Sequence, residues 1–260
     1  MKKNEAEILA IDIGNTTANG ALCSRGRFIK HFRIPTQKIR AQTLKVLRRQ
    51  IPADKKPVVV IASVVPQAGT FLKKNIPRAL KCPAYLIGKD LKVPIKNKYK
   101  NPRQVGADRL LNALAAFRKY KRELIVIDFG TAITFDIVSK KGEYLGGVIA
   151  PGIEISLDAL FSRTALLPKT KLLHTQEAIG RDTAASIRIG CSAGIGGLCD
   201  RIVDNIARRM HPKPLVVATG GYARFMSRYC QSIKKIDDDL VLKGIVYAYH
   251  AQLSKAAGHL

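Results

Sequence analysis

Two stretches of the chain place an aspartate two residues before a glycine, each directly after an apolar run. The first is Asp12-Ile-Gly14, which is followed by three short donor side chains, Asn15-Thr-Thr17. The second is Asp128-Phe-Gly130, which is followed by Thr131. A turn of this kind sets a carboxylate beside backbone N–H groups, and its glycine lets a phosphate approach the backbone closely. Two such turns facing each other across a cleft would serve phosphoryl transfer, which needs positioned oxygens and charge neutralisation.

A third glycine-rich turn, Thr219-Gly220-Gly221, follows the apolar run Leu215–Ala218. Adjacent glycines would let the base or ribose of a nucleotide approach the backbone closely. The same pattern is also typical of an ordinary turn from a strand into a helix, and by itself it leaves both interpretations open. Combined with the two Asp-x-Gly turns, it favours a nucleotide site.

The segment Tyr99–Arg109 leads into a predicted helix through Leu110–Phe117. Asp108 lies where this helix would begin, so the helix dipole favours its charge and its side chain could cap the first turn. Alternatively, Asp108 is a general base and Arg109 grips an anionic group beside it. The chemistry of these residues is compatible with both roles.

The elements around the two Asp-x-Gly turns repeat. In each copy the aspartate precedes a turn glycine, Gly26 or Gly142, by fourteen residues, and apolar strands lie on both sides of that turn. A third strand follows in each copy, Arg27–Ile34 in the first and Tyr144–Ala150 in the second. The repetition predicts a duplicated α/β fold in which each half begins with a three-stranded β-meander.

Helices and buried strands are expected to complete each half. The predicted helices are Thr36–Gln50, Gln67–Leu80, Ile153–Arg163, Thr183–Arg209 and one that starts within Asp239–His250. The predicted buried strands are Pro57–Ala62, Ala84–Ile87 and Leu215–Thr219, since continuous apolar runs are typical of strands covered on both faces. We place the crossover between the halves near Ala107–Tyr120, which gives halves of residues 1–118 and 119–260.

The formal net charge is +26, with 45 Lys and Arg against 19 Asp and Glu. Residues 1–122 hold 28 of these cationic side chains and 6 acidic ones, whereas residues 123–260 hold 17 and 13. So basic a half can attract nucleic acid, an acidic membrane surface or an anionic substrate. Because no RNA- or DNA-binding motif with interleaved aromatic residues accompanies the charge, we favour a solvated lysine-rich surface over a nucleic-acid partner.

The five cysteines are scattered and form no CxxC pair, which argues against a disulfide framework and against a zinc site. No apolar stretch reaches the roughly 20 residues needed to span a bilayer. Lys2 and Lys3 resemble the start of a signal peptide, but Asp12 interrupts the apolar run that follows, and no small-residue cleavage site is present. We expect a cytoplasmic protein with reduced thiols and no membrane partner.

Six motifs, in this order along the chain, resemble those of the type III pantothenate kinases. They are Asp12–Thr16, Gly106–Arg109, Asp128–Thr131, Tyr144–Gly152, Ile179–Thr183 and Ala218–Gly221. The resemblance implies the actin-like ATPase fold, which acetate and sugar kinases share with actin. It also implies a homodimer that uses ATP to phosphorylate pantothenate on its terminal hydroxyl. The product is 4′-phosphopantothenate, in the first step of coenzyme A biosynthesis.

The resemblance also implies roles for individual residues. Asp108 matches the family's proton acceptor. The implied nucleotide-binding residues are Asp12, Ile13, Gly14, Asn15, Thr16, Thr17, Ala18, Asn19, Thr131, Gly220 and Gly221. The implied pantothenate-binding residues are Tyr99, Gly106, Ala107, Asp108, Arg109 and Thr183. Asp128 matches the ligand of a monovalent cation, K⁺ or NH₄⁺, and Asp12 matches a residue that helps to hold Mg²⁺ or a similar divalent cation with the nucleotide.

The chain departs from the family pattern at two positions, where Lys100 and Gln104 replace acidic residues. Both changes make the substrate segment more basic without altering a residue assigned to chemistry. Arg109 and Arg181 are both candidates to contact the transferring phosphate. Two other functions stay open: another actin-like small-molecule phosphotransferase, and a non-catalytic member that binds nucleic acid through its basic half.

Overall fold

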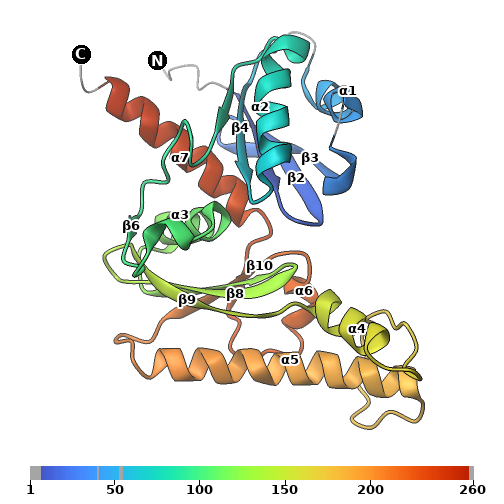
Figure 1. Cartoon of the computed structure of the whole chain (residues 1–260). Coiled ribbons are helices and arrows are strands. Elements are labelled where there is room, and N and C mark those ends of the chain that lie inside the picture. The colour runs from blue at the N-terminus through green and yellow to red at the C-terminus, as the bar shows by residue number, and fades with distance from the viewer. Residues whose placement is uncertain (1–6, 40, 53–54, 258–260) are drawn as a thin grey trace. The chain divides into compact units, whose positions relative to one another are not determined.

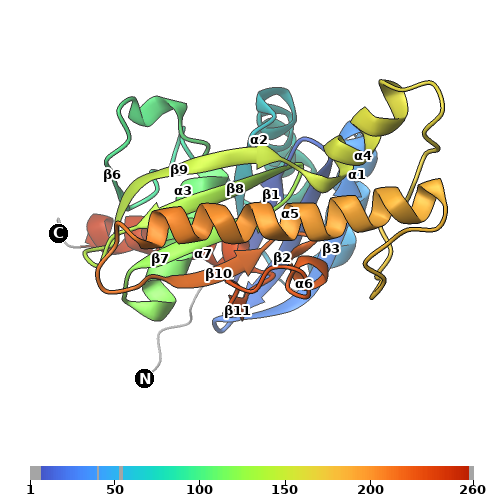
Figure 2. The ribbon, with the colours of Figure 1, turned by 90° about the horizontal axis from the view of Figure 1, so that it is seen from below.

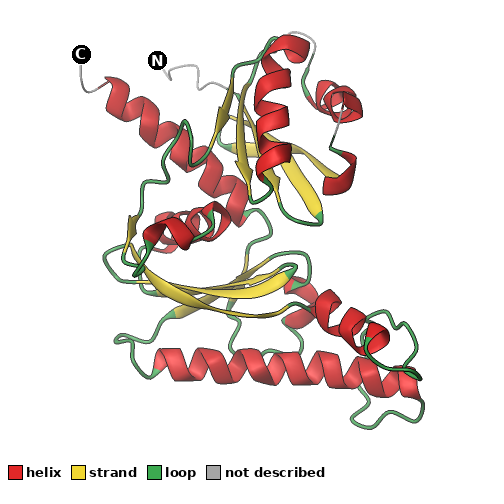
Figure 3. Ribbon diagram, in the orientation of Figure 1, coloured by secondary structure: helices red, strands yellow, loops and turns green. Residues whose placement is uncertain are grey.

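Both Asp-x-Gly turns lie at the ends of strands that start a β-meander. Figure 1 shows the helices and strands of the chain, coloured from the N-terminus to the C-terminus. The computed structural model describes residues 7–39, 41–52 and 55–257. The chain forms two units, one from residues 1–115 and 239–260 and the other from residues 116–238. Each unit is built on a β-sheet with helices packed against it (Figure 3).

The sheet of the first unit has the strand order β3-β2-β1-β4-β5. Its strands are β1 (Ile8–Ile13), β2 (Thr17–Ser24), β3 (Arg27–Pro35), β4 (Val58–Ser63) and β5 (Ala84–Leu86). β1, β2 and β3 are antiparallel, because short turns join them, whereas β4 and β5 run parallel to β1 after longer connections. Asp12 is the one polar residue of β1, and it lies at the end of the strand where the chain turns.

Helices cover both faces of this sheet. They are α1 (Ala41–Gln50), α2 (Pro66–Leu80), the start of α3 (Ala107–Tyr120) and α7 (Leu240–Ala257). Successive side chains of β1 point to opposite faces. Leu9 and Ile11 therefore join the buried cluster that contains Leu72 of α2, whereas Ile8 joins the cluster that contains Ile245 of α7. The segment before α3 adds a short strand, β6 (Lys96–Asn97), and a 3₁₀ turn at Pro102–Gln104.

The second unit repeats this plan with the strand order β11-β10-β7-β8-β9. Its strands are β7 (Leu124–Phe129), β8 (Ala132–Val138), β9 (Glu143–Pro151), β10 (Leu215–Thr219) and β11 (Lys235–Ile236). Its helices are α4 (Ile153–Ser162), α5 (Thr183–Ala207) and the short α6 (Ala223–Met226). Figure 2 shows α5 running across one face of the sheet, where Cys199 and Val203 are buried in one cluster with Ile125 and Ile127 of β7.

The two meanders agree in register as well as in order. Asp12 lies opposite Asn19 on β2, and Asp128 lies opposite Thr134 at the equivalent position on β8. The register between the second and third strands shifts at equivalent places, between Leu22 and Cys23 and between Ile137 and Val138. This agreement confirms the predicted duplication.

The two units differ from the predicted halves in where the last helix belongs. The described part of residues 239–260 belongs to the first unit, and the first boundary falls between Ala115 and Ala116, inside α3. The physical reason is burial, since Ile245, Val246 and Tyr249 of α7 cover apolar side chains of the first sheet.

The segment Thr36–Gln50, predicted as one helix, contains two separate elements. A 3₁₀ turn spans Thr36–Lys38, and Ile39 is extended with ψ of 92°. α1 then starts at Ala41. The Thr36 N–H donates to the Thr16 carbonyl at 2.9 Å, and its hydroxyl donates to the Gly14 carbonyl at 2.7 Å. These two bonds hold Thr36 against the first Asp-x-Gly turn instead of in a helix.

All five cysteines are buried and free of disulfides. Within the described ranges, no helix combines the length and the apolar character needed to cross a membrane. Over the same ranges, no cluster of three or more His, Cys, Asp or Glu side chains is arranged to hold a metal ion.

Candidate active site

The first Asp-x-Gly turn is a closed backbone loop between β1 and β2. The Gly14 N–H donates to the Thr17 carbonyl at 3.0 Å, and the Val64 N–H donates to the Ile13 carbonyl at 3.0 Å. Asp12 is half-buried, whereas Asn15 and Thr16 at the tip are exposed. The turn therefore presents backbone and short donor groups on a loop that β1 and Thr36 hold in place, as a phosphate-binding turn requires.

Asp108 lies in the first turn of α3, as predicted, and is half-buried. Its Oδ1 accepts a hydrogen bond from the Arg109 N–H at 2.9 Å. A Cβ atom on Gly106 would come within 2.4 Å of the same oxygen, so only glycine leaves the carboxylate this position. The Arg109 side chain is buried, with 8% of the residue exposed.

The predicted substrate segment before α3 is ordered by asparagine side chains. The Asn97 Oδ1 accepts from the Tyr99 N–H at 2.9 Å, and the Asn101 Oδ1 accepts from the Arg103 N–H at 3.3 Å. Tyr99 is half-buried, whereas the departures from the family pattern, Lys100 and Gln104, are exposed. The extra positive charge is thus on the surface of this segment.

The second Asp-x-Gly turn lies between β7 and β8. Asp128 is beside Thr219 of β10 in the parallel register and opposite Thr134 of β8 in the antiparallel one. Thr131 at the tip is exposed. A Cβ on Gly152 would come within 2.0 Å of the Thr131 carbonyl oxygen, so the Pro-Gly at the end of β9 packs directly on this turn.

The third predicted turn packs against Asp128 through Gly220. Its φ is +90°, and a Cβ there would lie 2.4 Å from the Asp128 Oδ1 and 2.8 Å from backbone atoms of Phe129. Gly221 is exposed, and a Cβ on it would meet nothing within 4 Å. The second unit therefore assembles Asp128, Thr219 and Gly220 at one place, with Thr131 at the tip of the same turn.

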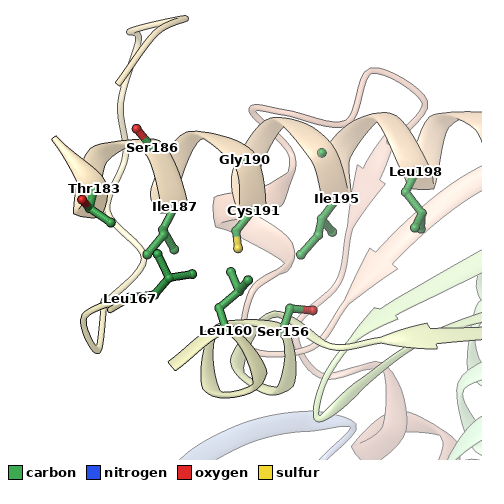
Figure 4. Close-up of a pocket in the computed structure, with 11 residues that line it drawn as sticks. Ser156, Leu160, Leu167, Thr183, Ser186, Ile187, Gly190, Cys191, Ile195 and Leu198 are labelled. Atoms are coloured by element: carbon green, nitrogen blue, oxygen red, sulfur yellow. The ribbon is translucent and has the colours of Figure 1, made fainter. Parts of the chain in front are cut away.

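Thr183 lies at a different feature of the second unit. It is the first residue of α5, directly after Asp182, whose carboxylate caps the helix by accepting from the Ala185 N–H at 2.7 Å. Thr183 lines a mainly apolar cavity of about 520 Å³ between α4 and α5, together with Leu160, Ile187 and Cys191 (Figure 4).

Asp136 is a buried polar residue that was not singled out from the sequence. Asp136 of β8 is completely buried. Its Oδ1 accepts from the Tyr144 hydroxyl at 2.9 Å, and its Oδ2 accepts from the Thr134 hydroxyl at 3.3 Å. The sequence analysis treated the strand before the Gly142 turn only as apolar, although a lone aspartate in such a run is itself a signal.

Comparison with known proteins identifies the family. A family model described as type III pantothenate kinase matches residues 8–205. A type III pantothenate kinase from Anaeromyxobacter dehalogenans (strain 2CP-C) is 40% identical over 245 residues, which cover 92% of this chain and 96% of that protein.

Solved structures show the fold. The activator of 2-hydroxyisocaproyl-CoA dehydratase from Clostridium difficile, with bound ADPNP, has a TM-score of 0.53 at 14% identity over 98% of both chains. The inorganic polyphosphate/ATP-glucomannokinase from Arthrobacter sp. strain KM has a TM-score of 0.52 at 16% identity over 95% of this chain and 100% of that one. The predicted actin-like ATPase fold is confirmed. Since the family model spans most of the chain and the sequence relative covers nearly all of it, the chain belongs to the type III pantothenate kinase family.

Proposed function

We propose that this chain transfers the γ-phosphoryl group of ATP to the terminal hydroxyl of pantothenate, giving 4′-phosphopantothenate and ADP. This is the first step of coenzyme A biosynthesis, and we place it in the cytoplasm. The observation that carries the proposal is membership of the type III pantothenate kinase family over residues 8–205. The two glycine-bearing turns and the carboxylate at the start of α3 support it, because these are parts that phosphoryl transfer needs.

Asp108 is the proposed general base. Its Oδ1 is engaged by the Arg109 N–H at 2.9 Å, which fixes the orientation of the carboxylate, and we assign Oδ2 as the oxygen that takes the proton of the pantothenate hydroxyl. The hydroxyl oxygen then attacks the γ-phosphorus, and the bond from that phosphorus to the β,γ-bridging oxygen breaks to release ADP. Tyr99, Gly106, Ala107, Arg109 and Thr183 are the proposed pantothenate contacts, with Arg109 or Arg181 beside the transferring phosphate.

The nucleotide is assigned to the residues of the first turn, Asp12 to Asn19, and to Thr131, Gly220 and Gly221. A divalent cation such as Mg²⁺ fits this set. Because no three-carboxylate or histidine cluster exists within the described ranges, it would be held by Asp12 together with phosphate oxygens and water, the usual manner for Mg²⁺. The cation neutralises phosphate charge when bound.

Asp128 is the proposed ligand of a monovalent cation, K⁺ or NH₄⁺. The Asp128 carboxylate lies in a space that a Cβ at position 220 would fill, at 2.4 Å from its Oδ1. Only glycine at position 220 leaves the carboxylate in this place. Asp128 also lies beside Thr219 and opposite Thr134, and carboxylate and hydroxyl oxygens are the kind of ligand that a hard cation takes, which supports the assignment.

A homodimer is also proposed. In the second unit, several large apolar side chains are exposed along α4, α5 and the segment between them: Phe161 (46%), Leu166 (91%), Ile179 (78%) and Leu198 (40%). Burying them against a second copy would remove this surface from water. Light scattering on the purified protein should give twice the mass of the chain, and Leu198→Asp should lower it; a monomeric wild type would reject the dimer.

The experiment that tests the catalytic proposal is ADP release with ATP, Mg²⁺ and K⁺, with and without pantothenate. We expect release to require pantothenate and to collapse when Na⁺ replaces K⁺. If pantothenate does not change ADP release in a protein that still binds ATP, the result would favour another actin-like phosphotransferase. A panel of small hydroxylated acids would then identify its substrate.

A further inference from the structure

A buried polar chain leads from Tyr144 to the position opposite Asp128. Along β8, Phe135 points into the core beneath α5, so its neighbours Thr134 and Asp136 lie on the opposite face of the sheet. Tyr144 donates its hydroxyl to Asp136 at 2.9 Å, and Thr134 donates its hydroxyl to the other carboxylate oxygen at 3.3 Å. Thr134 is in turn directly opposite Asp128 in the β7–β8 register.

The hydroxyl of Thr134 is oriented by this arrangement. A hydroxyl has one proton to donate and two lone pairs to accept with. The Thr134 hydroxyl donates its hydrogen bond to Asp136. The Thr134 oxygen can therefore only accept from, or coordinate, its other neighbours. A cross-strand partner lies only about 5 Å away between Cβ atoms. Thr134 therefore adds an oxygen acceptor, and no donor, on the side of Asp128 that it faces. An acceptor at this position favours binding of a cation over binding of an anion.

The first unit shows that the fold does not need this carboxylate. The register position of Asp136, opposite Val126 of β7, corresponds to Ala21 of β2, opposite Ala10 of β1. Ala21 is also completely buried, and it packs in an apolar cluster. Placing a carboxylate in such a position is costly unless hydrogen bonds compensate for its lost hydration. A duplicated fold that keeps alanine in one copy and a hydrogen-bonded aspartate in the other points to a role of the second unit alone.

We propose that Asp136 is a positioning residue for the cation site at Asp128 and acts through the Thr134 hydroxyl. The inference rests on the proposed function, which assigns the cation to Asp128. Asp136 itself touches neither substrate nor nucleotide in this role. It orients Thr134 and, through the bond from Tyr144, ties the second meander strand to the third, so that the β7–β8 turn keeps its shape when the cation leaves.

The test compares Asp136→Asn with the control Phe135→Leu, using thermal unfolding with ADP present and K⁺ replacing Na⁺ at constant ionic strength. Phe135 is equally buried but faces α5, so its variant reports general destabilisation of β8. Outer-sphere partners of a metal typically change its affinity by about 10–100-fold. We expect Asp136→Asn to raise the K⁺ concentration for half-maximal stabilisation at least about 10-fold, and Phe135→Leu to lower the unfolding temperature without moving that concentration.

Tyr144→Phe provides a second variant that keeps the packed ring and removes one hydrogen bond to Asp136; it should shift the K⁺ midpoint in the same direction by a smaller factor. If Asp136→Asn fails to fold, this variant decides the question. Unchanged K⁺ midpoints in folded variants, with a K⁺-responsive wild type, would overturn the role of Asp136. If K⁺ changes neither the stability nor the pantothenate-dependent turnover of the wild type, the cation assignment of Asp128 is rejected instead. The two results therefore distinguish an error about Asp136 from an error about Asp128.

Discussion

At the scale of single residues, the position of Asp108 explains how one side chain can serve both interpretations that the sequence left open. The carboxylate lies in the first turn of α3, as the capping interpretation requires. Its bond to the Arg109 N–H engages only Oδ1. A residue of the first helical turn can therefore also be the proposed base, with Oδ2 as the oxygen assigned to the substrate.

Asp108→Asn should remove the base and retain the shape of the side chain. We expect kcat with pantothenate to fall by about 10²–10⁴-fold, the usual contribution of a general base, while the unfolding temperature and the affinity for ATP change little. The measurement is steady-state turnover together with nucleotide binding by calorimetry. Near-normal turnover in the variant would exclude Asp108 as the base.

Gly220 and Gly221 form a matched pair for a second prediction. Gly220→Ala forces a Cβ to 2.4 Å from the Asp128 Oδ1 at a φ of +90°, whereas Gly221→Ala adds a Cβ in open space. We expect Gly220→Ala to cost about 1–2 kcal/mol of stability from the backbone conformation alone and to abolish K⁺-dependent turnover. Gly221→Ala should leave stability within about 0.5 kcal/mol. Equal effects of the two substitutions would contradict the packing of Gly220 on Asp128.

At the scale of elements, α5 contains adjacent glycines with opposite surroundings. A Cβ on Gly196 would come within 2.2 Å of the Tyr229 carbonyl oxygen, whereas one on Gly197 would meet nothing within 4 Å. Gly196→Ala should destabilise the protein by about 1–3 kcal/mol through overpacking. Gly197→Ala should stabilise it by about 0.5–1 kcal/mol, because alanine restricts the unfolded chain and favours helix. Urea unfolding of both variants measures the difference, and a loss of stability in Gly197→Ala would show that this face of α5 is covered.

The link between α5 and the segment after α6 depends on the charge of Asp200. Burial raises the pKa of Asp200, but hydrogen bonds from the Cys230 thiol and from Gln231 and Ser232 outweigh burial and hold the pKa below its ordinary value. The Gln231 and Ser232 N–H groups donate to its two oxygens at 2.9 and 2.8 Å. This stabilisation is therefore fully present above the pKa of an unfolded aspartate, near 3.9, and is lost as the pH falls through the lower folded value.

Asp200→Asn keeps one acceptor oxygen and turns the other into a donor that faces an N–H group. We expect a loss of about 1.5–3 kcal/mol at pH 7, the usual value for hydrogen bonds to a charged group. The difference from wild type should shrink as the pH drops below about 4. Unfolding free energies measured between pH 3 and pH 7 test this; a difference independent of pH would mean that charge is not what holds the link.

Much of the architecture is predictable from the sequence because local signals repeat. Each apolar run that ends in Asp-x-Gly must turn, and the matched spacing of the two copies predicts one topology used twice. What the sequence could not supply is which partner each group finds. Thr36 is held by the Gly14 carbonyl, and α7 returns to the first sheet, both through contacts distant along the chain. Asp136 finds its donors nearby, on its own strand and on β9. A residue pattern shows which side chains are polar, but not which partners satisfy them.

At the scale of the whole molecule, the charge of +26 is concentrated in residues 1–122. Ion pairs in the first unit include Lys73 with Asp90 and Lys55 with Glu7. We expect weak binding to duplex DNA at low salt that falls steeply as salt rises and is lost at physiological ionic strength, the behaviour of general charge attraction. Fluorescence anisotropy with a labelled duplex measures it. Tight binding that survives physiological salt would support the nucleic-acid alternative.

The return of α7 to the first sheet has a consequence for synthesis on the ribosome. β1 is translated early, but one face of its sheet is covered by α7, which is translated after the whole second unit. Domains fold as units while the chain emerges. The second unit can therefore complete its core first, and the first sheet must wait with Ile8 and Ala10 uncovered. During that interval the nascent chain exposes an apolar sheet face, which is the kind of surface that makes a folding intermediate prone to aggregate and that chaperones bind.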